Sequence, residues 1–228
     1  MDELTLVIPA KQEPNSLPIV LKELDKLNLN KIIVLKENDK ETIDSVKNLN
    51  CDILFQTGTG YGNAIRQGIS KVNTKYTAIY YADGSTDPKY LSKMLEKIKI
   101  ENNSIIFGSR YMKEAGSFDD DIITKIGNFI FTSIGNIFFS LKISDLLFTY
   151  IVAETEVLRK MKLNSDNYNL CVEIPIKAKS MKLKYDCFPC IERKRFADKK
   201  KVKAFKVGFE ILWYLIKSFF DSNFIDRK

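Results

Sequence analysis

Short runs of apolar and β-branched residues alternate with helical patterns through the first half of the chain. The strand-like runs cover residues 4–9, 31–35, 52–55, 77–82 and 104–108. Strands that alternate with helices pair in parallel, and the helices then cover both faces of the sheet. The pattern therefore predicts an α/β fold with a mostly parallel central sheet.

The pattern changes after residue 108. Apolar positions recur at helical spacing through 122–141 and predict one long amphipathic helix, and a final amphipathic helix is expected over about 203–220. Between them the pattern predicts two strands and two helices: 149–153, 182–191, 155–161 and 170–181. No linker or internal repeat divides the chain, so we predict a single domain over residues 1–228.

The composition adds one exclusion, because the sequence contains no histidine. Proton transfer must then fall to carboxylates, Lys, Tyr or the substrate itself. The C-x-x-C pair Cys187 and Cys190 lies in a strand-like run rather than at a helix N-terminus, which disfavours a redox site. A zinc site would have only two further cysteines to draw on, so we predict structural cysteines.

The net charge of +7 is concentrated in one segment. Residues 177–206 contain 12 basic and 3 acidic side chains, a charge of +9, so the rest of the chain carries −2. An anion is expected to bind at this segment. We expect no nucleic-acid partner, because the basic residues interleave with few aromatic residues and match no recognition motif.

The N-terminal sequence MDELTLVIPAK has no basic leader followed by an apolar core, and no uninterrupted apolar run approaches the roughly 18–20 residues of a membrane span. We therefore expect a cytoplasmic protein, and the few cysteines fit a reducing compartment. The final helix is apolar except for three charged residues on one side, beside the +9 segment. This predicts either a basic peripheral patch on the inner face of the cell membrane or ordinary core packing.

Polar residues follow each predicted strand of the first half. In an open parallel sheet, ligands bind beyond the carboxyl ends of the strands. Five loops are therefore expected to face one cleft: 9–14, 36–39, 57–63, 83–88 and 109–110.

Two of these loops contain residues suited to phosphate chemistry. Gly60 and Gly62 precede a helix whose N-terminal N–H groups, with Asn63, could approach a phosphate, and a plain turn is the alternative. Asp83 and Asp87 flank a Gly-Ser-Thr turn of the kind that presents carboxylates to a divalent cation holding a diphosphate. The alternative there is an Asx turn, with Asp87 capping the next helix.

With these loops in order, the sequence resembles family 2 glycosyltransferases of the GT-A fold, and among them the dolichyl- or polyprenyl-phosphate sugar transferases. Four segments of the first half are similar to the motifs of that family: PAKQE at 9–13, GYGNAIRQG at 60–68, YADGSTDP at 81–88 and GSRY at 108–111. Three features of the second half continue the likeness: an acceptor-side motif that begins at Asp145, Glu173 in a helix, and the stretch 195–200.

The resemblance implies a nucleotide-sugar-binding half at 1–115 and an acceptor-side half at 116–228. It implies these donor-nucleotide contacts: Pro9, Ala10, Glu13, Glu37, Gly60, Gly62, Asn63, Ala82 and Asp83. It implies phosphate and acceptor contacts from Arg110, Glu173, Arg195 and Lys200. Asp83 would hold Mg²⁺ or Mn²⁺, and Asp83, Asp145 and Arg110 form the implied catalytic set. For Arg110, an ion pair at the sheet edge is the alternative.

The implied reaction transfers a sugar, with inversion, from a UDP- or GDP-sugar to a polyprenyl (dolichyl-type) phosphate in cell-envelope or glycan biosynthesis. Such an acceptor is already an anion and needs no general base, which fits the missing histidine. A sugar hydroxyl would need a carboxylate such as Asp145 or Asp87. A membrane surface and an integral-membrane partner subunit join the expected partners.

Three places depart from the family pattern. Lys36-Glu37 stands where paired acids are expected, Tyr81 replaces the first acid of D-A-D, and residues 148–151 replace S-G-F-R. The alternative function is therefore a catalytically altered or inactive nucleotide-sugar-binding partner protein.

Overall fold

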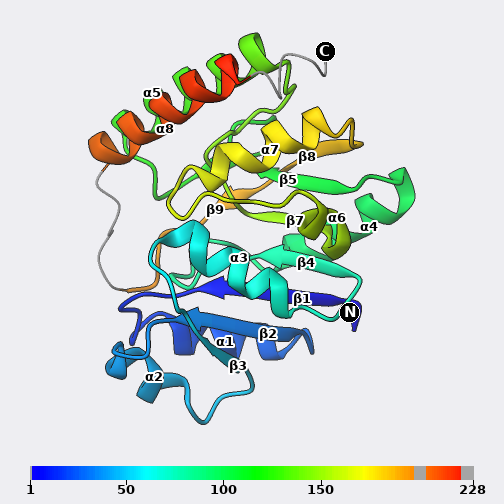
Figure 1. The fold of residues 1–228 in the computed structure, drawn as a ribbon. Helices are drawn as coiled ribbons and strands as arrows, with labels where there is room; N and C mark the ends of the chain where they lie inside the picture. Colours follow the sequence, from blue (N-terminus) through cyan, green and yellow to red (C-terminus); the bar gives the residue numbers. More distant parts are fainter. Residues whose placement is uncertain (1, 198–203, 222–228) are drawn as a thin grey trace.

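A seven-stranded sheet forms the centre of the protein, in the order β3-β2-β1-β4-β7-β5-β8 (Figure 1). This computed structural model describes residues 2–197 and 204–221. The strands are β1 Leu4–Pro9, β2 Asn30–Leu35, β3 Asp52–Phe55, β4 Tyr76–Ile79, β5 Ile105–Ser109, β7 Ile151–Glu154 and β8 Tyr185–Pro189. Neighbouring strands are parallel except at β7, which runs antiparallel to β4 and β5. The predicted mostly parallel sheet is confirmed.

Helices cover both faces of the sheet, as the alternating pattern predicts. The covering helices are α1 Leu17–Asp25, α2 Lys40–Val46, α3 Tyr61–Lys71, α4 Lys89–Glu101, α6 Thr155–Lys160 and α7 Leu170–Ser180. Along β1, Leu4, Leu6 and Ile8 join a core with α1, α2 and α4, whereas Val7 joins a second core with α3, α6 and α7. Strands buried on both sides in this way form parallel sheets.

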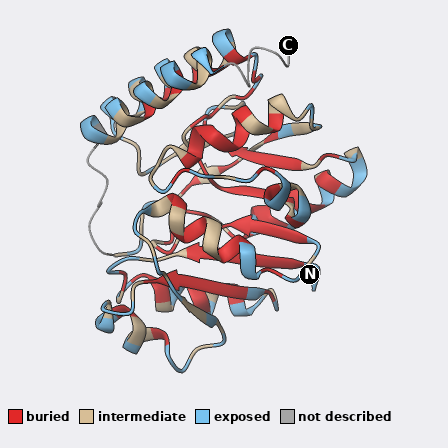
Figure 2. Cartoon of the chain, in the orientation of Figure 1, coloured by how far each residue is buried: buried red, intermediate tan, exposed pale blue. Residues whose placement is uncertain are grey.

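The remaining elements lie beyond the carboxyl ends of the strands or away from the sheet. A short parallel ribbon pairs β6 (Gly116–Ser117) with β9 (Ile191–Glu192). The long helix α5 (Ile122–Phe139) and the final helix α8 (Ala204–Phe220) confirm the two predicted amphipathic helices. They lie side by side at one end of the molecule, with much of their surface exposed (Figures 1 and 2).

Helix α5 has the length of a membrane span although its apolar residues form no uninterrupted run. Among the described residues it is the one helix long and apolar enough to cross a membrane by length and composition, and 22% of it is buried in the protein. The sequence has no uninterrupted apolar run of that length because Gly, Asn, Ser and Thr residues interrupt the apolar ones.

Helix α3 packs directly on β1 because Gly68 has no side chain. A Cβ atom at Gly68 would lie 2.3 Å from Cγ1 of Val7 and 3.1 Å from Cγ2 of Val34. Gly127 in α5 has the opposite setting, since nothing lies within 4 Å of its ideal Cβ position.

We predict that Gly68→Ala lowers the free energy of unfolding by about 1–3 kcal/mol through overpacking. The matched change Gly127→Ala should raise it by about 0.5–1 kcal/mol, because alanine is the better helix former. Denaturant unfolding of the two variants checks both signs. Equal effects would mean that α3 does not sit this close to β1.

Candidate functional site

The carboxyl ends of the first five strands open onto one cleft of about 1840 Å³, as predicted. Its lining includes residues from all five loops that follow these strands, together with side chains from α5 and α8. The loops meet here because β1 to β5 all run in the same direction. The cleft thus joins a polar end at the sheet to an apolar end at the two helices.

The loop after β1 forms part of the polar end. Pro9, Ala10 and Glu13 line the cleft, together with Glu37 from the loop after β2. Glu13 is buried, its Oε2 accepts a hydrogen bond from Ser16 at 2.6 Å, and its backbone N–H donates to Thr42 Oγ1 at 2.9 Å. The predicted donor residues of these two loops are therefore together, and α1 and α2 hold them in place.

Asp83 lies in a tight turn after β4, close to Ala82, and both line the cleft. One oxygen of Asp83 accepts from the backbone N–H of Ser85 at 3.0 Å and from its hydroxyl at 2.8 Å. The other oxygen lies 3.5 Å from Arg195 Nη1. One carboxylate oxygen thus stabilises the turn, and the other faces the guanidinium of Arg195 at the cleft wall.

Asp87 matches the alternative given for it. Its Oδ1 accepts from the backbone N–H of Lys89 at 3.0 Å at the start of α4, and its Oδ2 pairs with the ammonium of Lys89 at 2.9 Å. It is absent from the lining of the cleft. Asp87 therefore supports α4 rather than the chemistry.

The glycine loop contributes Thr59, Gly60 and Tyr61 to the lining of the cleft, whereas Gly62 and Asn63 lie against another loop. A Cβ at Gly60 would lie 2.1 Å from the carbonyl oxygen of Asp166, and one at Gly62 would lie 2.4 Å from that of Ser165. The backbone N–H of Asn63 donates to the carbonyl of Asp166 at 3.0 Å, and its side chain donates to the Asp166 carboxylate. Of the three residues predicted to contact a phosphate, Gly60 lines the cleft, whereas Gly62 and Asn63 pack against the other loop and do not line it.

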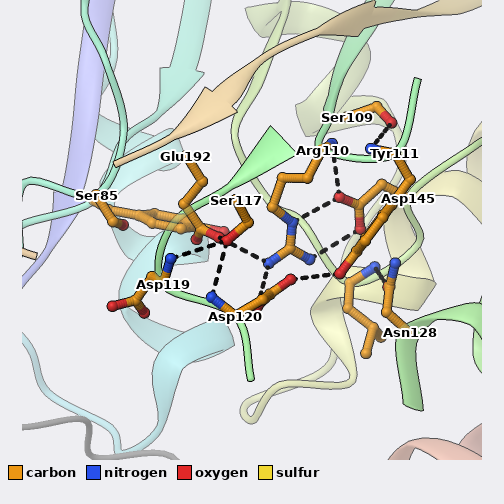
Figure 3. A network of polar contacts seen from close by, with 12 residues as sticks. Ser85, Ser109, Arg110, Tyr111, Ser117, Asp119, Asp120, Asn128, Asp145 and Glu192 are labelled. Carbon is orange, nitrogen blue, oxygen red and sulfur yellow. Dashed lines mark hydrogen bonds and ion pairs between the residues drawn. The ribbon is translucent and has the colours of Figure 1, made fainter. Parts of the chain in front are cut away.

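A buried ion cluster surrounds Arg110 at the end of β5 (Figure 3). Its guanidinium and backbone N–H form three hydrogen bonds with Asp145 of 2.7–3.0 Å, and Nη1 donates to Asp120 at 3.1 Å and Glu192 at 3.2 Å. The guanidinium also lies over the Phe148 ring, 4.6 Å from its centroid. These four charged side chains are at most 7% exposed.

The cluster corrects two predicted roles. Asp145 is fully buried, does not line the cleft, and uses both oxygens on Arg110, so it cannot accept a proton from a substrate. Arg110 is saturated by carboxylates, which is the ion-pair alternative, so we assign it a positioning role. Burial raises the pKa of Glu192, and Arg110 opposes this rise.

Two further predicted acceptor residues have other outcomes. Glu173 in α7 is fully buried and accepts from the backbone N–H groups of Asn164 and Ser165, both at 2.8 Å. Glu173 therefore stabilises the loop that contains Asn164 and Ser165, and it does not line the cleft. Arg195 does line the cleft and is bound to Asp119 at 2.6 Å. Lys200 lies outside the described residues.

The middle of the cleft contains a hydroxyl cluster that the sequence reasoning missed. The Thr149 hydroxyl lies 2.6 Å from that of Tyr61 and 3.0 Å from that of Tyr81, and its backbone N–H donates to Tyr81 at 2.9 Å. The ring of Tyr168 stacks on Tyr61 at 4.9 Å. Tyr81, which replaces an acid of the family motif, is therefore part of a neutral, hydrogen-bonded wall of the cleft. Tyr61, Tyr81 and Tyr168 are far apart along the chain, so no local sequence pattern predicts that they lie together.

The apolar end of the cleft lies between α5 and α8. Its walls include Ile126, Ile130 and Phe131 from α5 and Phe209 and Leu212 from α8. The acids Asp119, Asp120 and Glu192 also line the cleft, and for the first two the Asp119–Asp121 run before the long helix is the visible signal in the sequence.

The cysteines take no part in this chemistry. All four are free thiols, and Cys187 and Cys190 are buried, which confirms the structural assignment. Cys171 lines the cleft, but burial raises its pKa to about 12, so it stays protonated near neutral pH.

The sheet and its cleft have the architecture of the GT-A glycosyltransferases. Glucosyl-3-phosphoglycerate synthase from Mycobacterium tuberculosis, solved in complex with Mn²⁺, UDP and phosphoglyceric acid, superposes with a TM-score of 0.74 at 12% identity, over 97% of this chain and 80% of that chain. At this identity the likeness concerns the fold, and it confirms the predicted GT-A fold.

The sequence comparisons specify the family. The model of glycosyl transferase family 2 matches residues 5–162, so the chain belongs to this family and is a glycosyltransferase that uses a nucleotide sugar. An uncharacterized protein of Methanocaldococcus jannaschii is 25% identical over 224 residues, 94% of this chain and 91% of that protein. An uncharacterized glycosyltransferase of Mycobacterium tuberculosis is 27% identical over 97 residues, 42% of this chain and 44% of that protein.

We predict that Arg110→Met lowers the free energy of unfolding by about 3–5 kcal/mol, because three carboxylates remain buried without their cation. Their folded-state pKa values would then lie above the unfolded ones, so the variant should regain stability, relative to wild type, as the pH falls from neutral. Thermal melts across pH check this. Lys99→Met, which breaks the half-exposed pair with Glu3, is the control and should leave the melting temperature near that of wild type. Equal melting temperatures for the two variants would show that Arg110 has no structural role.

Proposed function

We propose that the protein transfers a sugar from a UDP- or GDP-sugar to a polyprenyl phosphate, with inversion, at the cytoplasmic face of a membrane in cell-envelope or glycan biosynthesis. One observation carries the proposal: a single cleft continues from Asp83 to the apolar walls of α5 and α8. A polyprenyl phosphate has the same division, since a charged head precedes an apolar chain.

A small, multiply charged acceptor such as phosphoglycerate fits the described cleft less well. Phosphate and carboxylate groups are bound most strongly by charge-assisted hydrogen bonds from cations, which apolar walls do not provide. Both arginines that line the described cleft are already paired, Arg110 with three carboxylates and Arg195 with Asp119. The lysines of the lining, Lys11, Lys36 and Lys40, belong to the loops after β1 and β2 and to the start of α2.

The placement of the acids also favours an acceptor that arrives ionised. A hydroxyl acceptor needs a general base within reach of its proton. Asp145 is enclosed, Asp87 lies outside the cleft lining, and Asp119, Asp120 and Glu192 are each bonded to an arginine. A phosphate oxygen attacks without giving up a proton, so none of these acids would have to act.

The residues around Asp83 fit a divalent cation that is shared with the donor. The described chain has no group of three or more Cys, Asp or Glu residues that could hold a metal by themselves. Mg²⁺ often takes one or two carboxylates and completes its shell with substrate phosphates and water. Mg²⁺ or Mn²⁺ on Asp83 would neutralise charge on the leaving diphosphate. Arg195, 3.5 Å from Asp83, adds positive charge on the same side.

A catalytically altered binding partner stays the alternative, because Tyr81 stands where an acid is expected. The two ideas differ in one measurable outcome. An active enzyme moves labelled sugar into an organic-soluble product, whereas an inactive binder retains affinity for the nucleotide sugar and gives no product.

We predict that incubation with labelled UDP- or GDP-sugars and a short polyprenyl phosphate yields an organic-soluble, acid-labile glycolipid. Asp83→Asn should lower the rate at least about a hundredfold, through the lost charge at the diphosphate. The control Asp87→Asn changes an acid outside the cleft and should stay within a few-fold of wild type. Transfer to phosphoglycerate but not to the lipid phosphate would overturn the acceptor assignment.

Removal of divalent cations provides a separate test of the Asp83 site. In EDTA the nucleotide sugar should no longer raise the melting temperature, and Mn²⁺ or Mg²⁺ should restore the shift in wild type but not in Asp83→Asn. A shift that is equal with and without EDTA would show that the donor binds without a metal.

A further inference from the structure

The α5 and α8 helices expose an unusual share of large apolar side chains. They carry 12 of the 18 large hydrophobic residues that are exposed in the described chain (Figure 2). We call the surface formed by the exposed residues of 122–138 and 205–220 the helix-pair face. A contiguous apolar surface of this kind usually marks a binding site.

Helix α5 has apolar residues on its exposed side and polar residues on its buried side, the reverse of a helix on a water-exposed surface. Two of its polar residues point inward: Asn128 and Thr132 accept from the backbone N–H groups of Leu147 and Leu146 at 3.1 and 3.0 Å. Phe129 and Ile137 point outward and are 73% and 72% exposed. A helix in water has the opposite arrangement, so the outer face of α5 is built for apolar surroundings.

Helix α8 extends the same surface. The ring of Phe131 in α5 lies 3.7 Å from the ideal Cβ position of Gly208, and the rings of Phe138 and Phe219 are 5.3 Å apart. The two helices therefore run side by side in the same direction, as Figure 1 shows. Phe205, Phe209, Trp213, Ile216 and Phe220 form the exposed stripe of α8.

We propose that the helix-pair face docks on the surface of a bilayer that contains anionic lipids. Its charges fit this occupant. Lys125, Lys206 and Lys217 are exposed on the two helices. Glu210 is the one acid within them, and its carboxylate accepts from Asn167 at 3.2 Å. Aromatic and aliphatic side chains beside lysines are the composition of interfacial helices.

The position of the cleft favours a bilayer over a second copy of the chain. Ile126, Ile130 and Phe209 belong to the helix-pair face and also line the apolar end of the cleft. A second copy seated there would close this end, and a two-fold contact would bring the lysines of one face toward those of the other. A bilayer would instead bring a lipid-linked acceptor to the cleft. The docking rests on the proposed function for its lipid-linked acceptor and deepens it by naming the surface that would meet the membrane.

The chain contains a reporter for this docking, since Trp213 is its single tryptophan and is 63% exposed on the face. Full-length protein added to vesicles of phosphatidylcholine and phosphatidylglycerol should show a blue shift of its tryptophan emission and quenching by brominated lipid. Binding should weaken in vesicles of phosphatidylcholine alone and at high salt.

Paired variants test the face itself by co-sedimentation with the vesicles. Phe129→Gln with Trp213→Gln alters two face residues outside the cleft lining and should lower the bound fraction about tenfold or more. The control Ile19→Gln with Ile100→Gln removes two apolar side chains, 49% and 74% exposed, from α1 and α4 and should bind like wild type. Both variants should keep the thermal shift with nucleotide sugar, which shows that they fold.

Two outcomes would overturn the docking proposal. Wild-type protein that stays in the supernatant, with no quenching by brominated lipid, has no affinity for the bilayer. A dimer that dissociates in the Phe129→Gln and Trp213→Gln variant, without vesicle binding by wild type, assigns the face to a second copy. Vesicle binding is measured without donor or acceptor, so its failure is distinct from failure of the transfer assay.

Discussion

The buried guanidinium of Arg110 is the interaction on which the acceptor side of the cleft depends. It joins the end of β5 to Asp145 before β7, to Asp120 before α5 and to Glu192 in β9. The next residue, Asp121, caps α5 by accepting from the N–H of Thr124 at 2.7 Å. The ion cluster therefore sets where α5 begins, and with it the apolar wall of the cleft. Because the desolvation of four charges is costly, the arrangement is stable only while all partners are present.

The fold was largely predictable from the sequence because each strand of the first half is a short apolar run followed by a helical pattern. Burial on both faces leaves few other arrangements for such strands. The short helix α2 follows from the alternation more than from its own sequence, since only two of its seven residues, Thr42 and Val46, are buried. The two-residue strands β6 and β9 were missed because their pairing depends on the ion cluster and on the loops around it.

The site was predictable at the level of loops and less so at the level of residues. Five loops meet at one cleft because parallel strands end at the same edge. Asn63 and Glu173 are predicted to contact ligands and Asp145 to be catalytic, yet each of them bonds to other groups of the protein. A sequence shows that a polar residue is present, but its partner is decided by contacts between segments that are distant along the chain. The role of Tyr81 likewise depends on a distant residue, because its hydroxyl lies 3.0 Å from that of Thr149.

The balance of charge in the cleft explains why a divalent cation belongs in the proposed mechanism. The lining of the described cleft contains five bases and eight acids: Lys11, Lys36, Lys40, Arg110 and Arg195 against Glu13, Glu37, Asp39, Glu41, Asp83, Asp119, Asp120 and Glu192. With all of these groups ionised, a nucleotide diphosphate would approach a wall with three excess negative charges. Attraction at short range in a partly desolvated cleft needs the opposite sign. In the proposed mechanism, further positive charge arrives with the substrate: a cation shared between Asp83 and the diphosphate would supply it where the leaving group develops its own charge.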